Sequence, residues 1–225
     1  MKIEIWSDYA CPFCYIGEKR LEKALATIPD KNIEVIFKSF ELDPTASKNV
    51  VSSTVDRFAQ KYGLTKTEAA ERIEQISEMG RAEGIDFKYA ETRYTNTFDA
   101  LRLTKFAQDK GHNEIIGKLF DAYFTKNLEL ANHDVLKKIA AECGLDSAEV
   151  EKILSGDKYA AEVRADEMQA ARLGVHGVPF FIVGGKYSLS GAQPAKILQQ
   201  AIEDYLAENS LDGMTCGADG CKFDA

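Results

Sequence analysis

The sequence predicts an α/β fold in which a β-α-β unit and a β-β-α unit enclose a long helical insertion. Alternating apolar residues near the N-terminus and two apolar runs around Gly184-Gly185 predict the strands, and helical spacing with many Glu, Lys, Arg and Ala residues predicts the insertion. With 225 residues, 45% of them hydrophobic, the chain is long enough for one core and a subdomain. We expect residues 1–43 and 174–208 to form one discontinuous domain, 44–173 a helical domain, and 209–225 a flexible tail.

The β-α-β unit is the first predicted element. Residues 2–6 alternate polar and apolar positions, which is typical of a strand. A helix is expected from Pro12, because proline suits a first helical turn, and its apolar stripe continues until Pro29. A second alternating run at 33–40 predicts another strand. The segment between the first strand and this helix holds Cys11.

The helical insertion follows. Gly63 and Gly111 are among its turn signals, and Asn132 is a plausible N-cap ahead of an amphipathic run. The expected helices are about 54–62, 65–83, 96–110, 112–125, 132–143, 146–154 and 157–173.

Strands return after the insertion, at 179–183 and 186–189. The Gly184-Gly185 pair between them predicts a hairpin, since both central positions of such a turn can require a positive φ. A last helix is expected over 194–207. Because the tail 209–225 contains three glycines, we expect it to be largely irregular.

Composition excludes several classes of function. The net charge of −8 leaves no positive surplus to hold a phosphate backbone, so nucleic acid is not an expected partner. The N-terminus lacks the 7–15-residue apolar stretch of a secretory signal, and no run approaches the roughly 20 apolar residues that span a bilayer. We therefore expect a soluble, cytoplasmic protein that does not enter a membrane.

Cysteines carry the chemistry that the sequence predicts. Five cysteines, an odd number, in a chain of this size argue against a structural disulfide framework. Cys11 and Cys14 lie one helical turn apart, close enough to cycle between dithiol and disulfide. Cys11 is the expected nucleophile, because the start of a helix favours a thiolate. A zinc half-site is the alternative, and it requires two further ligands.

Two segments resemble a known family. Residues 8–17, Asp-Tyr-Ala-Cys-Pro-Phe-Cys-Tyr-Ile-Gly, resemble the active-site segment of the DsbA-like thioredoxin-fold family and, within it, the FrnE-like dithiol–disulfide isomerases. Residues 174–181 resemble the segment that holds this family's cis-proline. The resemblance implies a thioredoxin fold with an inserted helical domain. It also implies that Pro179 is cis and lies beside the cysteines, where it turns the backbone toward Cys11 so that a substrate strand can pair there.

The same resemblance suggests further residues of the site. Pro12, Phe13 and Val178 become candidates for lining a substrate groove. Asn96-Thr97 and Leu101-Arg102-Leu103 match the FrnE-like pattern, but we interpret them as a helix N-cap and a packed helix face.

One departure from the family concerns proton transfer. Many thioredoxin-fold enzymes place a buried carboxylate six residues before the nucleophilic cysteine, where this chain has Ile5. Asp8 and His176 are the candidates to handle protons instead, with a solvated loop residue and a solvent-facing turn residue as the alternatives. If Asp8 takes this role, Asp8→Asn alters the pH dependence of Cys11 alkylation.

Three cysteines remain. Cys216 and Cys221 flank a glycine-containing spacer that permits their sulfurs to approach, and some FrnE-like proteins have a comparable pair. We consider a second redox pair beside two alternatives, a tail disulfide and a metal site. Cys143 is expected to be a buried, inert thiol.

The predicted function is that of a thiol–disulfide oxidoreductase or isomerase without metal or organic cofactor. Cys11 would attack a substrate disulfide, and Cys14 would resolve the mixed disulfide. The expected partners are proteins with disulfides or small thiols such as glutathione, and both a monomer and a homodimer stay open. One rival is a glutathione-dependent isomerase or transferase of the kappa-like class, although those enzymes have Ser at the catalytic turn. The other is a zinc-stabilised binding module.

Overall fold

The central element of the computed structural model is a four-stranded sheet with the order β2-β1-β3-β4. The structure describes residues 1–29, 32–211, 214–217 and 220–223, and side chains only as far as Asn209. β1 and β2 are parallel, whereas β3 is antiparallel to both β1 and β4. The strands are β1 (Lys2–Ser7), β2 (Glu34–Ser39), β3 (Phe180–Val183) and β4 (Tyr187–Ser190).

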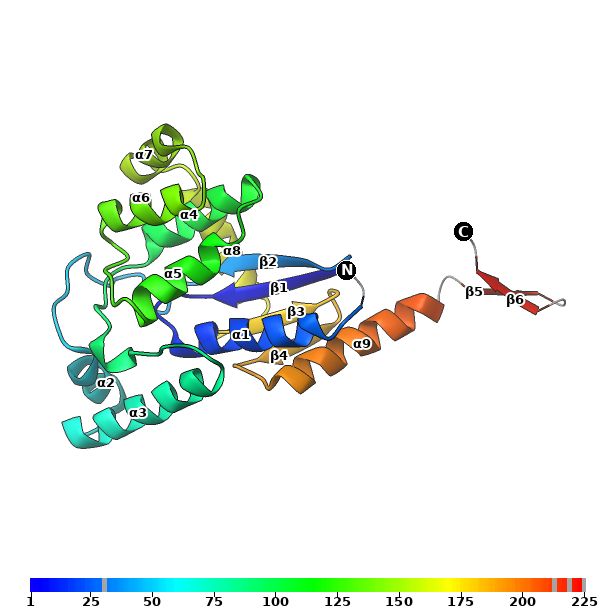
Figure 1. Ribbon diagram of the computed structural model, residues 1–225, viewed down its shortest axis with the longest axis horizontal. Helices are drawn as coiled ribbons and strands as arrows, with labels where there is room; N and C mark the ends of the chain where they lie inside the picture. Colours follow the sequence, from blue (N-terminus) through cyan, green and yellow to red (C-terminus); the bar gives the residue numbers. More distant parts are fainter. Residues whose placement is uncertain (30–31, 212–213, 218–219, 224–225) are drawn as a thin grey trace.

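Helices cover both faces of this sheet (Figure 1). Ile3 and Ile5 of β1 point to one face, where they pack with residues of α1 (Pro12–Ala26) and α9 (Ala195–Leu211). Trp6 points to the other face, where it packs against Ala170 of α8 (Ala160–Arg172). The alternation of side chains along a strand therefore gives the sheet two buried faces.

The helical insertion lies between β2 and β3 in the chain, and the predicted α/β fold class with its insertion is confirmed. Predicted and observed bounds differ by a few residues. Besides α8, the inserted elements are α2 (Thr54–Tyr62), α3 (Lys66–Ala82), a 3₁₀ turn η1 (Tyr89–Glu91), α4 (Phe98–Asp109), α5 (Ile115–Phe124), α6 (His133–Glu142) and α7 (Ser147–Ser155).

The start of α4 corrects one sequence expectation. The helix begins at Phe98 rather than at residue 96, and Thr97 at the N-cap position makes no side-chain capping bond. Asn96 Oδ1 accepts from the Phe98 N–H at 2.9 Å instead, while the Thr97 hydroxyl donates to Asp8. Thr97 thus ties the helical insertion to the loop before α1. At α6, Asn132 is the N-cap that the sequence predicts.

Aromatic rings join the insertion to the sheet domain. Tyr15 of α1 stacks on Phe120 of α5 with ring centroids 5.1 Å apart. Tyr9 packs edge-on against the same ring at 4.9 Å and stacks on Phe37 of β2 at 5.4 Å. One buried core therefore runs from the insertion to the start of α1.

Glycines set the turn between β3 and β4. Gly184 and Gly185 have φ values of 59° and 71°, as the hairpin between β3 and β4 requires. The expectation of a largely irregular tail was wrong, since β5 (Met214–Gly217) and β6 (Gly220–Phe223) pair antiparallel. Glycines suit a tight chain reversal as well as irregular backbone, so their presence did not distinguish the two. No helix in the described part of the chain is long and apolar enough to cross a membrane.

Candidate active site

Two unbonded thiols mark the start of α1. Cys11 is the N-cap residue and Pro12 follows in the first turn, where proline leaves no hydrogen bond unmade. The Cys14 N–H donates to the Cys11 carbonyl at 3.1 Å, so the two cysteines lie one turn apart on the helix. This is the placement that the sequence predicts, and it permits a disulfide between them.

The loop before β3 lies directly beside Cys11. The Val178–Pro179 peptide bond is cis, as the resemblance implies, and the Cys11 thiol donates to the Val178 carbonyl at 3.3 Å. Gly17 of α1 lets this loop approach the helix. A Cβ at Gly17 would lie 3.0 Å from Pro179 Cγ and 3.2 Å from Phe181 Cζ, which is too close for ordinary packing.

A groove of about 450 Å³ opens at Cys11. Pro12, Phe13 and Val178, the groove residues expected from sequence, line one side of it, and α2 and α3 of the insertion form the other. Figure 1 shows this helix pair at the end of the sheet where α1 begins.

The insertion supplies cations to this groove, which sequence reasoning missed. Arg57, Lys61 and Arg72 line it, and none of them forms an ion pair with a carboxylate of the described residues. The Arg57 guanidinium lies 3.8 Å from the centre of the Tyr94 ring, and its Nε is buried without a hydrogen-bond partner. In a chain of net charge −8, this groove is locally positive.

Cys14 faces a different cavity, of about 330 Å³, between α1, the sheet and α5. Burial raises the pKa of its thiol well above the usual range, and the neighbouring Cys11 raises it further. Hydrogen bonds with the Ser7 side chain and the Asp8 backbone lower it in part. Cys14 is therefore held as the neutral thiol.

Glu18 lines the same cavity as Cys14, and the sequence analysis did not single it out. Its Oε2 is buried and has no hydrogen-bond partner. Burial raises the pKa of this carboxyl to about 8. Its position four residues after Cys14, on the same helix face, was the sequence signal that could have identified it.

Asp8 is buried rather than solvated, so the solvated alternative was wrong. Its Oδ1 accepts from the Ala10 N–H at 3.1 Å and from the Thr97 hydroxyl at 2.8 Å. Its Oδ2 accepts from the Leu42 N–H at 2.8 Å. Burial raises its pKa, and these hydrogen bonds lower it in part. Asp8 thus fixes the loop that leads into Cys11, whereas His176 is exposed to solvent.

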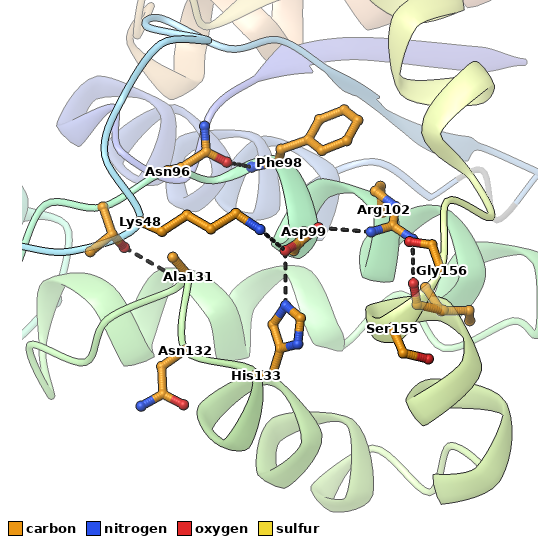
Figure 2. Close-up of polar contacts among 12 residues, drawn as sticks. Lys48, Asn96, Phe98, Asp99, Arg102, Ala131, Asn132, His133, Ser155 and Gly156 are labelled. Carbon is orange, nitrogen blue, oxygen red and sulfur yellow. Dashed lines mark hydrogen bonds and ion pairs between the residues drawn. The ribbon is translucent and has the colours of Figure 1, made fainter.

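A buried ion network lies apart from the cysteines, in the insertion (Figure 2). The Asp99 carboxylate contacts Arg102 at 2.7 Å, His133 at 2.9 Å and Lys48 at 3.2 Å. Arg102 also donates to the Gly156 carbonyl at 2.7 Å. These bonds join α4 to α6 and to the segment after α7, which makes the network a structural tie.

Other residues singled out in the sequence are placed as follows. Cys143 is buried at the end of α6, and burial raises the pKa of its thiol. The side chains of Cys216 and Cys221 lie outside the described residues, although their backbones pair directly opposite each other. Within the described residues, no group of three or more His, Cys, Asp and Glu side chains has an arrangement able to hold a metal.

Two known proteins are similar to this chain over nearly its whole length. YwbO of Bacillus subtilis, an uncharacterized protein, is 29% identical over 208 residues, which cover 90% of this chain and 96% of that relative. The crystal structure of a probable DsbA oxidoreductase, SCO1869 from Streptomyces coelicolor, matches with 37% identity, a TM-score of 0.88 and complete coverage of both chains.

Two more distant structures share the fold. A 2-hydroxychromene-2-carboxylate isomerase has 15% identity and a TM-score of 0.70 over 93% of this chain and 98% of its own. The cytosolic disulfide reductase DsbM from Pseudomonas aeruginosa with GSH has 17% identity and a TM-score of 0.58 over 94% and 98%. The model of the DsbA-like thioredoxin domain family matches residues 2–203. This chain therefore belongs to the DsbA-like thioredoxin domain family and has the fold of its thiol–disulfide oxidoreductases.

Proposed function

We propose that this protein exchanges disulfides with its substrates through a mixed disulfide on Cys11, which Cys14 resolves. The observation that carries the proposal is the pair of unbonded thiols at the start of α1, which face different cavities. Cys11 lines the groove that a substrate can enter. Both thiols are buried, but Cys14 lines the other cavity and has a raised pKa, as suits a thiol that reacts only in the second step.

The second step converts the mixed disulfide into the Cys11–Cys14 disulfide. The Cys14 sulfur attacks Cys11 Sγ, and the bond between Cys11 and the substrate sulfur breaks. The substrate is thereby reduced and the cysteine pair oxidised, and the reverse sequence oxidises a substrate dithiol. The FrnE-like isomerase subgroup and a cytoplasmic location belong to this proposal, and the cytosolic description of DsbM supports the location.

Small anionic disulfides such as glutathione disulfide are the proposed substrates, beside protein disulfides. The three unpaired cations of the groove favour carboxylates next to the reacting sulfur. A structural neighbour of the same fold holds GSH, which supports the same choice. A glutathione-dependent isomerase remains the second candidate because of the isomerase neighbour, but Cys11 stands where such enzymes have serine.

The proposal is tested by trapping the mixed disulfide. Reduced Cys14→Ser protein, treated with glutathione disulfide, is expected to accumulate a glutathione adduct on Cys11, identified by peptide mass spectrometry. Cys11→Ser should form no adduct at Cys14, and Cys143→Ser should behave like the wild type. Turnover that persists in Cys11→Ser would contradict the proposal.

Cys216 and Cys221 form the second part of the proposal, as a pair that exchanges with the first. Directly opposite positions of antiparallel strands place Cβ atoms about 4.5–5.5 Å apart, near the range of a disulfide. Their backbone register is of this kind. Replacing both with serine should slow reoxidation of the Cys11–Cys14 dithiol, and wild-type kinetics would remove the pair from the mechanism.

A further inference from the structure

The cavity that Cys14 lines also holds a carboxylate, although Ile5 occupies the strand position where many thioredoxin-fold enzymes have one. Ile5, Cys14 and Glu18 all line this cavity. We propose that Glu18 takes the proton of Cys14 when the mixed disulfide is resolved and returns it in the reverse reaction. This inference rests on the function proposed above.

The helix itself places the two groups together. Cys14 and Glu18 are separated by four residues in α1, so their side chains are neighbours on one helix face, with Cβ atoms roughly 5–6 Å apart. Gly117 of α5 faces this carboxylate, since a Cβ there would lie 4.0 Å from Glu18 Oε1. A cavity of about 330 Å³ also has room for a water that relays the proton.

The buried carboxylate has a polar atom that nothing else uses. Glu18 Oε2 is buried and accepts no hydrogen bond, which costs free energy unless the group has a role. Asp8 differs in this respect, because donors from Ala10, Thr97 and Leu42 occupy both of its oxygens. Of the two acids, Glu18 is the one free to accept a proton.

The surroundings hold the pKa of the Glu18 carboxyl near neutral pH. Burial raises its pKa to about 8, and the like charge of Glu22 adds to this effect. Lys19 lowers the pKa, but its ammonium pairs with Glu22 at 2.8 Å. The nearby phenols of Tyr9 and Tyr15 have raised pKa values and stay neutral. The polar residues that line the cavity with Glu18 are Ser7, Cys14, Glu22 and Asn113.

The resolution step transfers one proton and exchanges one disulfide bond for another. The Cys14 thiol gives its proton to the ionised Glu18 carboxylate, and the Cys14 thiolate attacks Cys11 Sγ. The Cys11–Cys14 bond forms as the bond from Cys11 to the substrate sulfur breaks, and the electron pair of that bond leaves with the substrate thiolate. The substrate thiolate is protonated by water, and Glu18 releases its proton to solvent. A base whose pKa lies near the working pH is well matched to this transfer.

The test follows both steps in single-turnover reactions of the reduced protein with glutathione disulfide, quenched with acid and analysed by mass spectrometry. In Glu18→Gln, the mixed disulfide on Cys11 should form at the wild-type rate, and its resolution at pH 8 should slow about 100-fold. The wild-type resolution rate should level off near pH 8, and the variant should lose this inflection. Unchanged resolution, or equal slowing of both steps, would overturn the inference.

Glu22→Gln is the matched control, because it removes the same charge one turn further along α1. The substitution takes away a like charge that raises the pKa of Glu18, so the inflection should move to lower pH and remain present. Loss of the inflection in both variants would show that the charge of α1 matters and that Glu18 has no particular role.

A titration of the unaltered protein gives an independent measurement. The side-chain carboxyl carbon of Glu18, followed by ¹³C NMR and assigned with Glu18→Gln as reference, should titrate near pH 8 and shift when the Cys11–Cys14 disulfide forms. An ordinary titration near pH 4.5 would overturn the inference even if Glu18→Gln failed to fold. Absence of any mixed disulfide in the Cys14→Ser protein would instead contradict the proposed function.

Discussion

At the scale of single residues, the two thiols differ through their surroundings alone. Cys11 and Cys14 are chemically identical and one helical turn apart, yet each lines a different cavity. Because the interior disfavours charge, Cys14 stays protonated until a base removes its proton. In the mechanism proposed above, this difference sets the order in which the two sulfurs react.

The groove cations allow a prediction about substrate choice. Arg57→Gln should lower kcat/KM for glutathione disulfide about five-fold, the loss expected from one favourable charge contact at a half-exposed site. The same variant should leave kcat/KM for cystamine, a cationic disulfide, unchanged or higher. Steady-state assays with both disulfides measure the ratio, and equal losses for both substrates would show that Arg57 acts through the fold.

Glu18 also links stability to pH. Its carboxyl binds a proton more tightly in the folded chain, with a pKa of about 8, than in the unfolded chain near 4.5. The stabilisation is therefore fully present below pH 4.5 and is lost as the pH rises through 8. Between pH 5 and pH 9, wild type should lose about 2–4 kcal/mol of unfolding free energy relative to Glu18→Gln, measured by urea denaturation. Parallel pH profiles of the two proteins would contradict this.

At the scale of elements, the contact between α1 and the loop before β3 sets the site. Gly17 is needed because a Cβ there would lie 3.0 Å from Pro179 Cγ and 3.2 Å from Phe181 Cζ. No turn and no positive φ at Gly17 explains the residue. The absence of a side chain there brings Val178 within hydrogen-bond distance of Cys11.

A pair of glycine substitutions tests this contact. Gly17→Ala should destabilise the protein by about 1–3 kcal/mol through overpacking, and it should slow mixed-disulfide formation because the loop moves away from Cys11. Gly117→Ala, also inside a helix, meets no atom closer than 4.0 Å. It should be neutral or stabilising by up to about 1 kcal/mol. Thermal unfolding of both variants compares the two sites, and equal effects would argue against the close approach at Gly17.

At the scale of the whole molecule, the insertion does more than cover the sheet. It supplies α2 and α3 as the second wall of the groove at Cys11, and residues of its α5 line the cavity beside Glu18. Aromatic stacking between Tyr15 and Phe120 fixes it against α1. The domain boundaries expected from the sequence stay a prediction. One buried core contains residues of both the insertion and the start of α1.

The Asp99 network predicts how the insertion responds to acid. Burial raises the pKa of Asp99, but hydrogen bonds from His133, Arg102 and Lys48 outweigh it and hold the pKa below its usual 3.8. The stabilisation is present above that value and is lost as the pH falls through the folded pKa. Asp99→Asn should therefore cost about 2–4 kcal/mol at pH 7, with a smaller difference from wild type near pH 3. Chemical denaturation at both pH values measures this, and a constant difference would contradict it.

The sequence alone determined the order of elements and the chemistry of the site. Alternation along β1 and β2, the stripe of α1 and the spacing of Cys11 and Cys14 are local patterns, and local patterns are set by the backbone geometry of strands and helices. The two segments of residues 8–17 and 174–181 also sufficed to bring Pro179 into the hypothesis, 168 positions after Cys11.

Tertiary structure decided the partners of the site, because they come from positions with no local pattern between them. In the sequence, Asp8 is an acidic residue of a predicted loop. Only the packing of Thr97 and Leu42 against it makes it a buried anchor. In the sequence, Glu18 is an ordinary charged residue of a predicted helix. It becomes a candidate base because residues of α5 and the sheet line the same cavity and leave its Oε2 buried, and burial is a property of the folded whole that spacing along one helix does not contain.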